Sequence, residues 1–289
     1  LYEVNADSSS LNQVKKLGEN VNTRYHESTS AITKDGKTLF FTRNNIEKRK
    51  TVKDENGIVR LKMLRAQMTD EGIWGEVEEL PFNSDSYSVA NPALSPDEKT
   101  LYFASDMPGT FGESDLFMVS INQDGTFGTP QNLGSNINTE ARETFPFITS
   151  EEILYFSSDG HPGLGGLDVF ATKIKRQDFS GKILNVGKPV NSNNDDFTFI
   201  FNEDLRTGFV ASNREEGLGY DDIYSFTETK PLTFDCLQKV TGTVRDKISN
   251  EVLVGATVKV INEENEELIS TITDSDGNYA LELDCNKGN

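Results

Sequence analysis

Apolar stretches recur along this chain at a nearly regular spacing. Four of them, TLFF, TLYF, ILYF and TGFV, end at Phe41, Phe103, Phe156 and Val210. The steps between them are 62, 53 and 54 residues. A polar turn such as TKDGKT or SPDEKT precedes each stretch, which is typical of a β-hairpin connection. The pattern therefore predicts a repeated antiparallel unit.

The residues after each apolar stretch also keep a fixed spacing. A Ser-Asp or Ser-Asn pair comes first, and nine residues later an Asp begins a third apolar segment. A short fourth segment follows, as in GTPQNLGSNI. Each unit then contains four short strands, and sheets of this kind bury both faces when they pack radially around an axis. The spaced positions are Asp106 with Asp115, Asp159 with Asp168, and Asn213 with Asp222.

These units predict an all-β fold with a five-bladed β-propeller. LYEVNAD aligns with the third strand of a unit and QVKKLGENVNT with the fourth, so we expect residues 1–24 to form the outer half of a blade whose inner half precedes Leu1. The last unit is expected to have three strands and to end near Glu228. The longer first step contains IEKRKTVKDENGIVR, which we expect to be an extended loop.

The pattern changes after the last unit. We predict a propeller at residues 1–229, a linker at 230–235 and a small, incomplete β-sandwich of four strands at 236–289. Cys236 and Cys285 bracket the sandwich, and their even number favours a disulfide between its first and last strands, with two buried thiols as the alternative. A disulfide would indicate an oxidising compartment such as the bacterial periplasm.

The charge of the chain excludes some partners. It has 47 acidic and 28 basic residues and a net charge of −19, which argues against nucleic acid, because phosphate binding requires a basic surface. The acidic residues are either a solvated surface or an attraction for basic partners or divalent cations. No apolar run reaches the length of a membrane span, and no targeting signal is visible.

Few residues suggest catalysis. His26 and His161 are the two histidines, and they occupy different repeat positions without a nearby cysteine, which disfavours a zinc site. No GxSxG motif is present, and GHPGLGGLD lacks the strand, loop and helix context of a phosphate-binding loop. We therefore expect the chain not to be an enzyme and to need no cofactor.

The spaced acidic residues have two interpretations. Their carboxylates would either accept hydrogen bonds that fix each loop or bind calcium. The structural role is favoured, because one or two carboxylates for each loop fall short of the ligand number that calcium prefers. The segment DSDGN resembles part of a calcium loop but lacks its terminal Glu, so we predict a hairpin turn there.

The connections into the innermost strands are the candidate binding surface. Each starts at an Asn and runs eight residues into the next unit, and the residue types within it differ from unit to unit. We predict that these loops gather at one mouth of the propeller and contact a protein partner, with ordinary solvated loops as the alternative. The candidate residues are His26, Glu27, Tyr87, Ser88, Arg142, Glu143, Asp195 and Asp196.

Two groups of segments resemble known families. SPDEKTLYFASD and ETFPFITSEEILYFSSDGHPGLGGLDVF resemble the PD40 (WD40-like, TolB-like) propeller repeats of Bacteroidetes envelope proteins. VTGTVRDKISNEVLVGATVKVINEE, followed by TDSDGNYALEL, resembles a carboxypeptidase-regulatory-like domain with a transthyretin-type sandwich. This order is similar to that of PorE-like proteins of the OmpA family, which are associated with type IX secretion and gliding motility.

The resemblance implies a function. It implies a non-enzymatic periplasmic scaffold that links an outer-membrane complex, such as one with a PorP/SprF-type barrel, to the cell wall. Peptidoglycan binding would require an OmpA-like domain that these residues do not include. The alternatives are a ligand-binding propeller with a cation or glycan in its channel or loops, and a hydrolase in which the propeller gates a catalytic domain.

Overall fold

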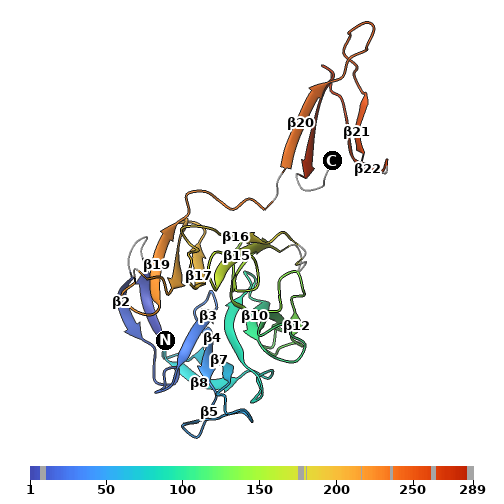
Figure 1. Cartoon of the computed structure of the whole chain (residues 1–289). Helices are drawn as coiled ribbons and strands as arrows, with labels where there is room; N and C mark the ends of the chain where they lie inside the picture. The colour runs from blue at the N-terminus through green and yellow to red at the C-terminus, as the bar shows by residue number, and fades with distance from the viewer. Residues whose placement is uncertain are drawn as a thin grey trace. The chain divides into compact units, whose positions relative to one another are not determined.

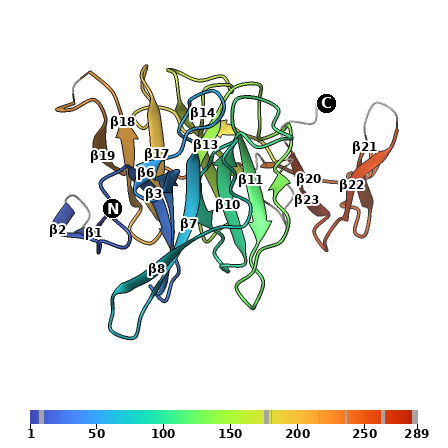
Figure 2. The same ribbon diagram turned by 90° about the horizontal axis from the view of Figure 1, so that it is seen from below.

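The computed structural model describes residues 1–6, 11–174, 179, 181–215, 217–234, 237–261 and 265–284, and within them it contains strands and turns but no helix. Accordingly, this part of the chain has no helix long and apolar enough to cross a membrane. The chain divides into two compact units, Leu1–Pro231 and Leu232–Asn289. In the first unit, sheets follow one another around a central axis (Figure 1), and Figure 2 shows these sheets from the side.

Four sheets of the first unit correspond to the predicted repeats. We call them blades 1 to 4, and the strands within each are antiparallel and hydrogen-bonded in chain order. Blade 1 contains β3 (Glu27–Ile32), β4 (Thr38–Asn44), β7 (Leu61–Met68) and β8 (Trp74–Glu79). Blade 2 contains β9 (Val89–Leu94), β10 (Thr100–Ser105), β11 (Asp115–Ser120) and β12 (Gln131–Asn132). Blade 3 contains β13 (Glu143–Ile148), β14 (Ile153–Ser158), β15 (Asp168–Lys173) and β16 (Leu184–Asn185). Blade 4 contains β17 (Asp196–Asn202), β18 (Thr207–Ser212) and β19 (Asp222–Thr227).

This arrangement confirms an all-β, propeller-like fold with four blades. The four apolar stretches lie at matching places, because each is the second strand of a blade and its last residue pairs with the third strand. The third strands of blades 2 to 4 begin at the predicted aspartates. The matching pairs are Phe41 with Leu64, Phe103 with Phe117, Phe156 with Phe170, and Val210 with Tyr224.

Two further strand pairs lie outside these blades. β1 (Tyr2–Ala6) pairs with β2 (Leu11–Lys16), and the adjacent Leu1 and Leu17 pack on a cluster that contains Phe41 of blade 1. β5 (Ile46–Glu47) and β6 (Lys50–Thr51) form a small hairpin in the segment expected to be an extended loop, so that prediction is wrong. Lys48 and Arg49 close the hairpin with positive φ at both positions, a conformation that their side chains do not signal in the sequence.

The hydrophobic core of the first unit lies between neighbouring blades. Phe40 of blade 1 packs with Leu101 and Phe103 of blade 2. Leu116 of blade 2 packs with Phe156 of blade 3. Because burial of one such side chain stabilises the fold by about 1.5–3 kcal/mol, each blade depends on its neighbours for its core.

The second unit contains the four predicted strands. β20 (Leu237–Thr243) pairs with β23 (Asn278–Asp284), and β21 (Thr257–Ile261) pairs with β22 (Glu267–Ile272). The predicted turn at DSDGN connects β22 to β23, and the Asp274 carboxylate accepts hydrogen bonds from the N–H groups of Asp276 and Asn278. Cys236 and Cys285 lie outside the described residues, so the disulfide stays a prediction.

Candidate functional site

We call each connection into an innermost strand a link. Each link begins at an asparagine, and in the links of blades 2 to 4 its side chain hydrogen-bonds the backbone of the third strand in the preceding blade. The Asn138 side chain accepts a hydrogen bond from the Leu116 N–H at 2.8 Å and donates one to the Leu116 carbonyl at 3.0 Å. The carbonyls also accept a backbone N–H, such as that of Leu133 on Leu116, but the N–H groups depend on the asparagines because β12 and β16 contain only two residues each. The equivalent pairs are Asn138 with Leu116, Asn191 with Val169, and Asn83 with Met63.

A buried acid ends three of the four links. In blade 3, the Glu143 carboxylate accepts hydrogen bonds from the Thr139 N–H and hydroxyl, both at 2.7 Å, and from the Ser158 hydroxyl at 2.6 Å. Glu143 and its equivalent Asp196 are both 0% exposed. Hydrogen bonds to a buried carboxylate are strong, so they hold the link in one conformation. The matching donor and acid pairs are Thr23 with Glu27, Thr139 with Glu143, and Ser192 with Asp196.

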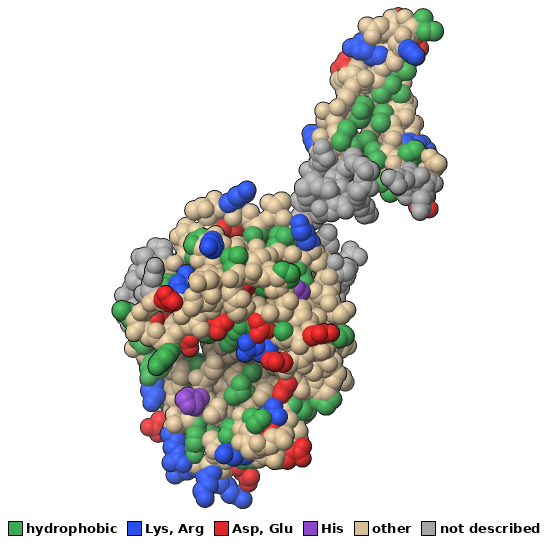
Figure 3. Space-filling view, viewed as in Figure 1, with side chains coloured by type: hydrophobic (Ala, Val, Ile, Leu, Met, Phe, Trp, Pro, Cys, Tyr) green, Lys and Arg blue, Asp and Glu red, His purple; other side chains and the backbone are tan. Residues whose placement is uncertain are grey.

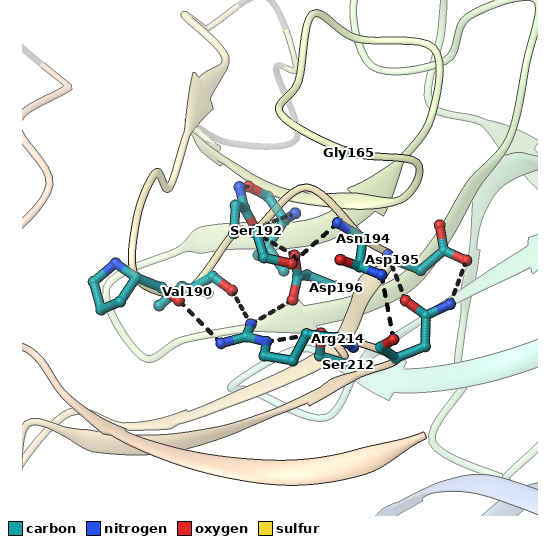
Figure 4. Close-up of polar contacts among 12 residues, drawn as sticks. Gly165, Val190, Ser192, Asn194, Asp195, Asp196, Ser212 and Arg214 are labelled. Atoms are coloured by element: carbon teal, nitrogen blue, oxygen red, sulfur yellow. Dashed lines mark hydrogen bonds and ion pairs between the residues drawn. The ribbon is translucent and has the colours of Figure 1, made fainter. Parts of the chain in front are cut away.

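Arg214 compensates the charge of the buried acid in blade 4 (Figure 4). Its guanidinium forms an ion pair with Asp196 and donates a hydrogen bond to the Val190 carbonyl at 2.8 Å. Its Nε donates to the Ser212 hydroxyl at 2.9 Å, and its Cζ lies over the Tyr224 ring, 4.6 Å from the ring centre. This network ties the link to the loop that follows β18.

The buried acids correct part of the predicted partner surface. Glu143 and Asp196 are inaccessible to a partner, and the Glu27 side chain is almost fully covered beside Arg43. Their role in the structure is to fix the links. Sequence reasoning missed this because acids in loops are mostly solvated. The signal that identifies them is a Ser or Thr four residues before the acid, directly after the link asparagine.

The residue directly before the one that ends each link differs in type from blade to blade. The pairing of the inner strands aligns Glu27, Val89, Glu143 and Asp196. The link of blade 2 is one residue longer than the others, so the alignment predicted for Tyr87 and Ser88 is wrong by one residue. Tyr87 packs against the core between blades 1 and 2, and its hydroxyl donates to the Phe82 carbonyl at 3.2 Å. The residues at the variable position are His26, Ser88, Arg142 and Asp195.

The backbone at this variable position is held in the same way in blades 2 to 4. The N–H group of Arg142 donates to the Asp159 carboxylate at 2.8 Å, and that of Asp195 donates to the Asn213 side-chain oxygen at 2.8 Å. The Ser88 N–H makes the equivalent bond to Asp106. The backbone that carries the variable side chain is therefore fixed by an equivalent hydrogen bond in these three blades, and we call this arrangement the frame.

The second member of each spaced acidic pair fixes the loop before the third strand. Asp115 accepts hydrogen bonds from the Phe111 N–H at 2.8 Å and the Asn132 amide at 2.6 Å. Asp168 accepts them from Leu164 and Gly165, and Asp222 from Gly219. These are the contacts of the loop-fixing alternative. Across the described ranges, no group of three His, Cys, Asp or Glu residues has a geometry that could hold a metal ion.

The variable position in blade 3 carries a cation among carboxylates. The hydrogen-bonded Asp159 carboxylate raises the pKa of Arg142, and the charges of Glu113 and Asp195 add to this effect. The Arg142 side chain is still 49% exposed. Figure 3 shows acidic side chains interspersed with Lys and Arg on one face of this unit, so a partner of this surface would meet both signs of charge.

A cavity of about 280 Å³ lies between the innermost strands of the four blades. Asn91, Phe145 and Thr198 contribute to its lining, and each has positive φ at a β-bulge of its strand. The described residues that line it carry no charged side chain. The cavity thus lacks the carboxylates that usually ligate calcium.

Residues 239–287 match the family model of the carboxypeptidase regulatory-like domain. This match confirms the resemblance noted for the second unit. A search of curated proteins found no match.

Solved structures similar to this chain include three enzymes. A puromycin-hydrolyzing peptidase from Mycobacterium tuberculosis is 14% identical with a TM-score of 0.42, over 73% of this chain and 33% of that one. An alpha-L-arabinofuranosidase from Lactobacillus brevis is 15% identical with a TM-score of 0.45, over 72% and 76%. The periplasmic gluconolactonase of Pseudomonas aeruginosa is 12% identical with a TM-score of 0.39, over 98% and 94%. This chain thus spans about a third of the peptidase's length.

These similarities contradict the prediction that the chain is not an enzyme, because the structures found include a peptidase, a glycosidase and a lactonase. That prediction depended on missing motifs such as GxSxG, and a catalytic site assembled from separate blades needs no such motif. At these identities and TM-scores, the similarities transfer no activity to this chain, and we assign none.

Proposed function

We propose that this chain is a periplasmic protein-interaction scaffold that contacts its partner through the link face, the surface formed by the links. One observation carries the proposal: His26, Ser88, Arg142 and Asp195 occupy the same structural position in four blades, and in blades 2 to 4 the backbone N–H there is held by a side chain of the loop after the second strand. Rigid loops lose little conformational entropy on binding, so their variable side chains can determine partner choice.

We further propose that the propeller has five blades. Leu1 and Asn22 repeat the contact of Leu116 and Asn138, because the Asn22 amide donates to the Leu1 carbonyl at 2.8 Å. β1 and β2 therefore correspond to the third and fourth strands of a further blade. The inner two strands of that blade would be supplied by polypeptide other than residues 1–289.

The exposure of blade 4 supports this fifth blade. Ile223 is 65% exposed, whereas the residues at the equivalent place in blades 1 to 3 are 0% exposed. Two inner strands placed next to blade 4 would cover Ile223 as each blade covers its neighbour. The equivalent residues are Met63, Leu116 and Val169.

The resemblance to PorE-like proteins of the OmpA family supplies the proposed partner and location. We infer that the scaffold belongs to an outer-membrane complex of type IX secretion or gliding and contacts a PorP/SprF-type barrel. Contact with peptidoglycan would be made by a separate OmpA-like domain. The match at residues 239–287 supports the predicted order of domains, and the PD40-like repeats support the envelope assignment.

Photocrosslinking in the native envelope tests the proposal. A photoreactive amino acid would replace His26, Arg142 or Asp195 in the full-length protein, with Glu71 as the matched control. Glu71 lies in the turn between β7 and β8. This turn is at the end of the sheets opposite the links, which we call the hairpin end. We expect an outer-membrane barrel to crosslink from the link positions and not from Glu71. Equal capture from Glu71, or no protein captured from any link position, would refute the link face as the contact surface.

A further inference from the structure

The hairpins that join the first and second strands contact each other at two blade boundaries. Between blades 1 and 2, the backbone N–H of Lys34 donates to the Glu98 carboxylate. Between blades 3 and 4, the N–H of Ser150 donates to the Glu203 carboxylate at 2.6 Å. In both cases the second residue of one turn donates to an acid in the turn of the next blade.

The boundary between blades 2 and 3 lacks the donor for this contact. Pro96 occupies the position of Lys34 and Ser150, and proline has no backbone N–H. Glu152 occupies the position of Glu98, with a φ of 61° against 58°. Among the described residues, the Glu152 carboxylate has no hydrogen-bond or ion-pair partner.

A pocket of about 390 Å³ is present at this boundary. Its inner wall includes Tyr102 from blade 2 and Ile148 and Ile174 from blade 3, and its rim carries the carboxylates of Glu151 and Glu152. The pocket therefore combines an apolar wall with a negatively charged rim. It lies at the hairpin end of the sheets, so it is separate from the link face.

Tyr102 has an unpartnered polar group in this pocket. The residue is only 4% exposed and lines the pocket, and its hydroxyl has no hydrogen-bond partner within the described part of the chain. Burial, with smaller contributions from the charges of Asp97 and Glu152, raises the pKa of Tyr102 to about 12. This hydroxyl is open to the pocket and not sealed from solvent, so a bound ligand would replace water as its hydrogen-bond partner.

Among the described residues that line the pocket, Asp97, Glu151 and Glu152 are acidic and none is basic. Asp97 also lines the pocket, and the hydrogen bond from the Ser95 hydroxyl lowers the pKa of its carboxyl group. The nearby Lys34 ammonium is held by the Pro96 carbonyl at 2.7 Å. Glu151 and Glu152 are exposed, and within the described part of the chain their carboxylates have no ion-pair partner.

We propose that this pocket binds a lysine or arginine side chain presented by a partner protein. The aliphatic stem would lie against Ile148 and Ile174, and the cationic head would pair with the rim carboxylates and donate to the Tyr102 hydroxyl. A metal ion has no stem to cover the apolar wall, and a neutral apolar side chain leaves the carboxylates unpaired. The net charge of −19 also attracts a basic partner to this surface.

Methyl NMR of the isoleucine-labelled chain tests this site. The probe is the peptide acetyl-Gly-Gly-Lys-Gly-Gly-amide, and the comparison peptide has norleucine in place of lysine. We expect saturable shifts of the Ile148 and Ile174 methyl signals with the lysine peptide and about fivefold weaker binding of the norleucine peptide, as for one solvent-accessible ion pair. Equal affinity for both peptides, or no shift with either, would overturn the proposal.

Two variants test the roles of individual residues. The double variant Glu151→Gln/Glu152→Gln should lose the preference for lysine, whereas the control Glu113→Gln, at the link-face ion pair with Arg142, should keep it. Pro96→Ser restores the missing N–H, so Glu152 is expected to pair across the boundary and lysine binding to weaken. Unchanged lysine preference in the double variant, with its melting temperature retained, would contradict the site.

Discussion

Replacement of Arg214 by methionine tests whether a buried charge holds the link of blade 4. Arg214→Met keeps much of the side-chain volume but removes the guanidinium that pairs with the fully buried Asp196. Loss of one partner from a buried ion pair costs about 3–5 kcal/mol, because the remaining charge stays desolvated. Asp196 keeps its hydrogen bonds from the Ser192 N–H and hydroxyl, so we expect a loss of about 3 kcal/mol.

Arg142→Met is the matched control. Arg142 also pairs with an acid, Asp159, but its side chain is 49% exposed, and solvent-accessible pairs contribute only about 0–1 kcal/mol. Urea unfolding followed by circular dichroism and by the fluorescence of Trp74, the only tryptophan, measures both variants. With a urea m-value of about 3 kcal/mol/M, Arg214→Met should lower the midpoint by about 1 M.

The double variant Arg214→Met/Asp196→Asn separates loss of charge compensation from loss of packing. It should be more stable than Arg214→Met alone, because no uncompensated charge remains. The electrostatic reasoning is refuted if the free energies of unfolding of Arg214→Met and Arg142→Met differ by less than about 1 kcal/mol. It is also refuted if the double variant is no more stable than Arg214→Met.

Three other predictions concern the frame of the propeller. Asn191→Ala should cost about 1–3 kcal/mol in urea unfolding, because the buried Val169 N–H loses its partner, whereas the Val169 carbonyl keeps the hydrogen bond from the Val186 N–H. The exposed Asn193→Ala should cost under about 0.5 kcal/mol, and similar losses would contradict the role of Asn191. Burial raises the pKa of Glu203, but hydrogen bonds from Ser150 and Glu151 outweigh it and lower the pKa below its ordinary 4.5. The stabilisation that the ionised Glu203 carboxylate gives the fold is therefore present above about pH 4.5 and is lost as the pH falls through the lowered folded-state pKa. The Glu203→Gln variant should consequently be less stable at neutral pH and lose less stability on acidification. A variant with the same acid sensitivity as the natural chain would show that Glu203 does not contribute. Ile223→Ser should cost under about 1 kcal/mol in residues 1–289, against about 3 kcal/mol or more for Leu116→Ser, because only Leu116 is buried here; equal losses in thermal unfolding would contradict the open face of blade 4.

The sequence contained enough information to predict the blades because turn chemistry and apolar spacing agree in each repeat. In blade 2, the apolar stretch that ends at Phe103 marks the second strand and Asp115 marks the start of the third. The fixed spacing between these two positions made both strands predictable. The β5–β6 hairpin was not predictable in this way, because Lys48 and Arg49 adopt positive φ without the Gly or Asn that usually signals such a turn.

The candidate site was only partly predictable. The positions of the links follow from the repeat, but burial within them does not, because Glu143 and Arg142 are adjacent and both polar, yet one is fully buried and the other exposed. The extra residue in the blade 2 link shifted the alignment of Tyr87 and became visible only through the pairing of β9 with β10. The pocket between blades 2 and 3 lies where Pro96 provides no backbone donor. This missing donor is recognised only by comparison with the other two boundaries, where the N–H groups of Lys34 and Ser150 donate across to the next blade.

Capture of the outer-membrane partner by charge-reversed protein tests the central claim most directly. The full-length protein would carry Arg142→Glu and Asp195→Lys, which exchange the charges of two variable link positions, and the control would carry Lys37→Glu and Glu71→Lys, two exposed turn positions at the hairpin end. The account predicts that the link-face variant recovers at least about tenfold less barrel, equivalent to about 1.4 kcal/mol of binding free energy, whereas the control recovers the natural amount. Undiminished recovery by a correctly folded link-face variant would contradict the account.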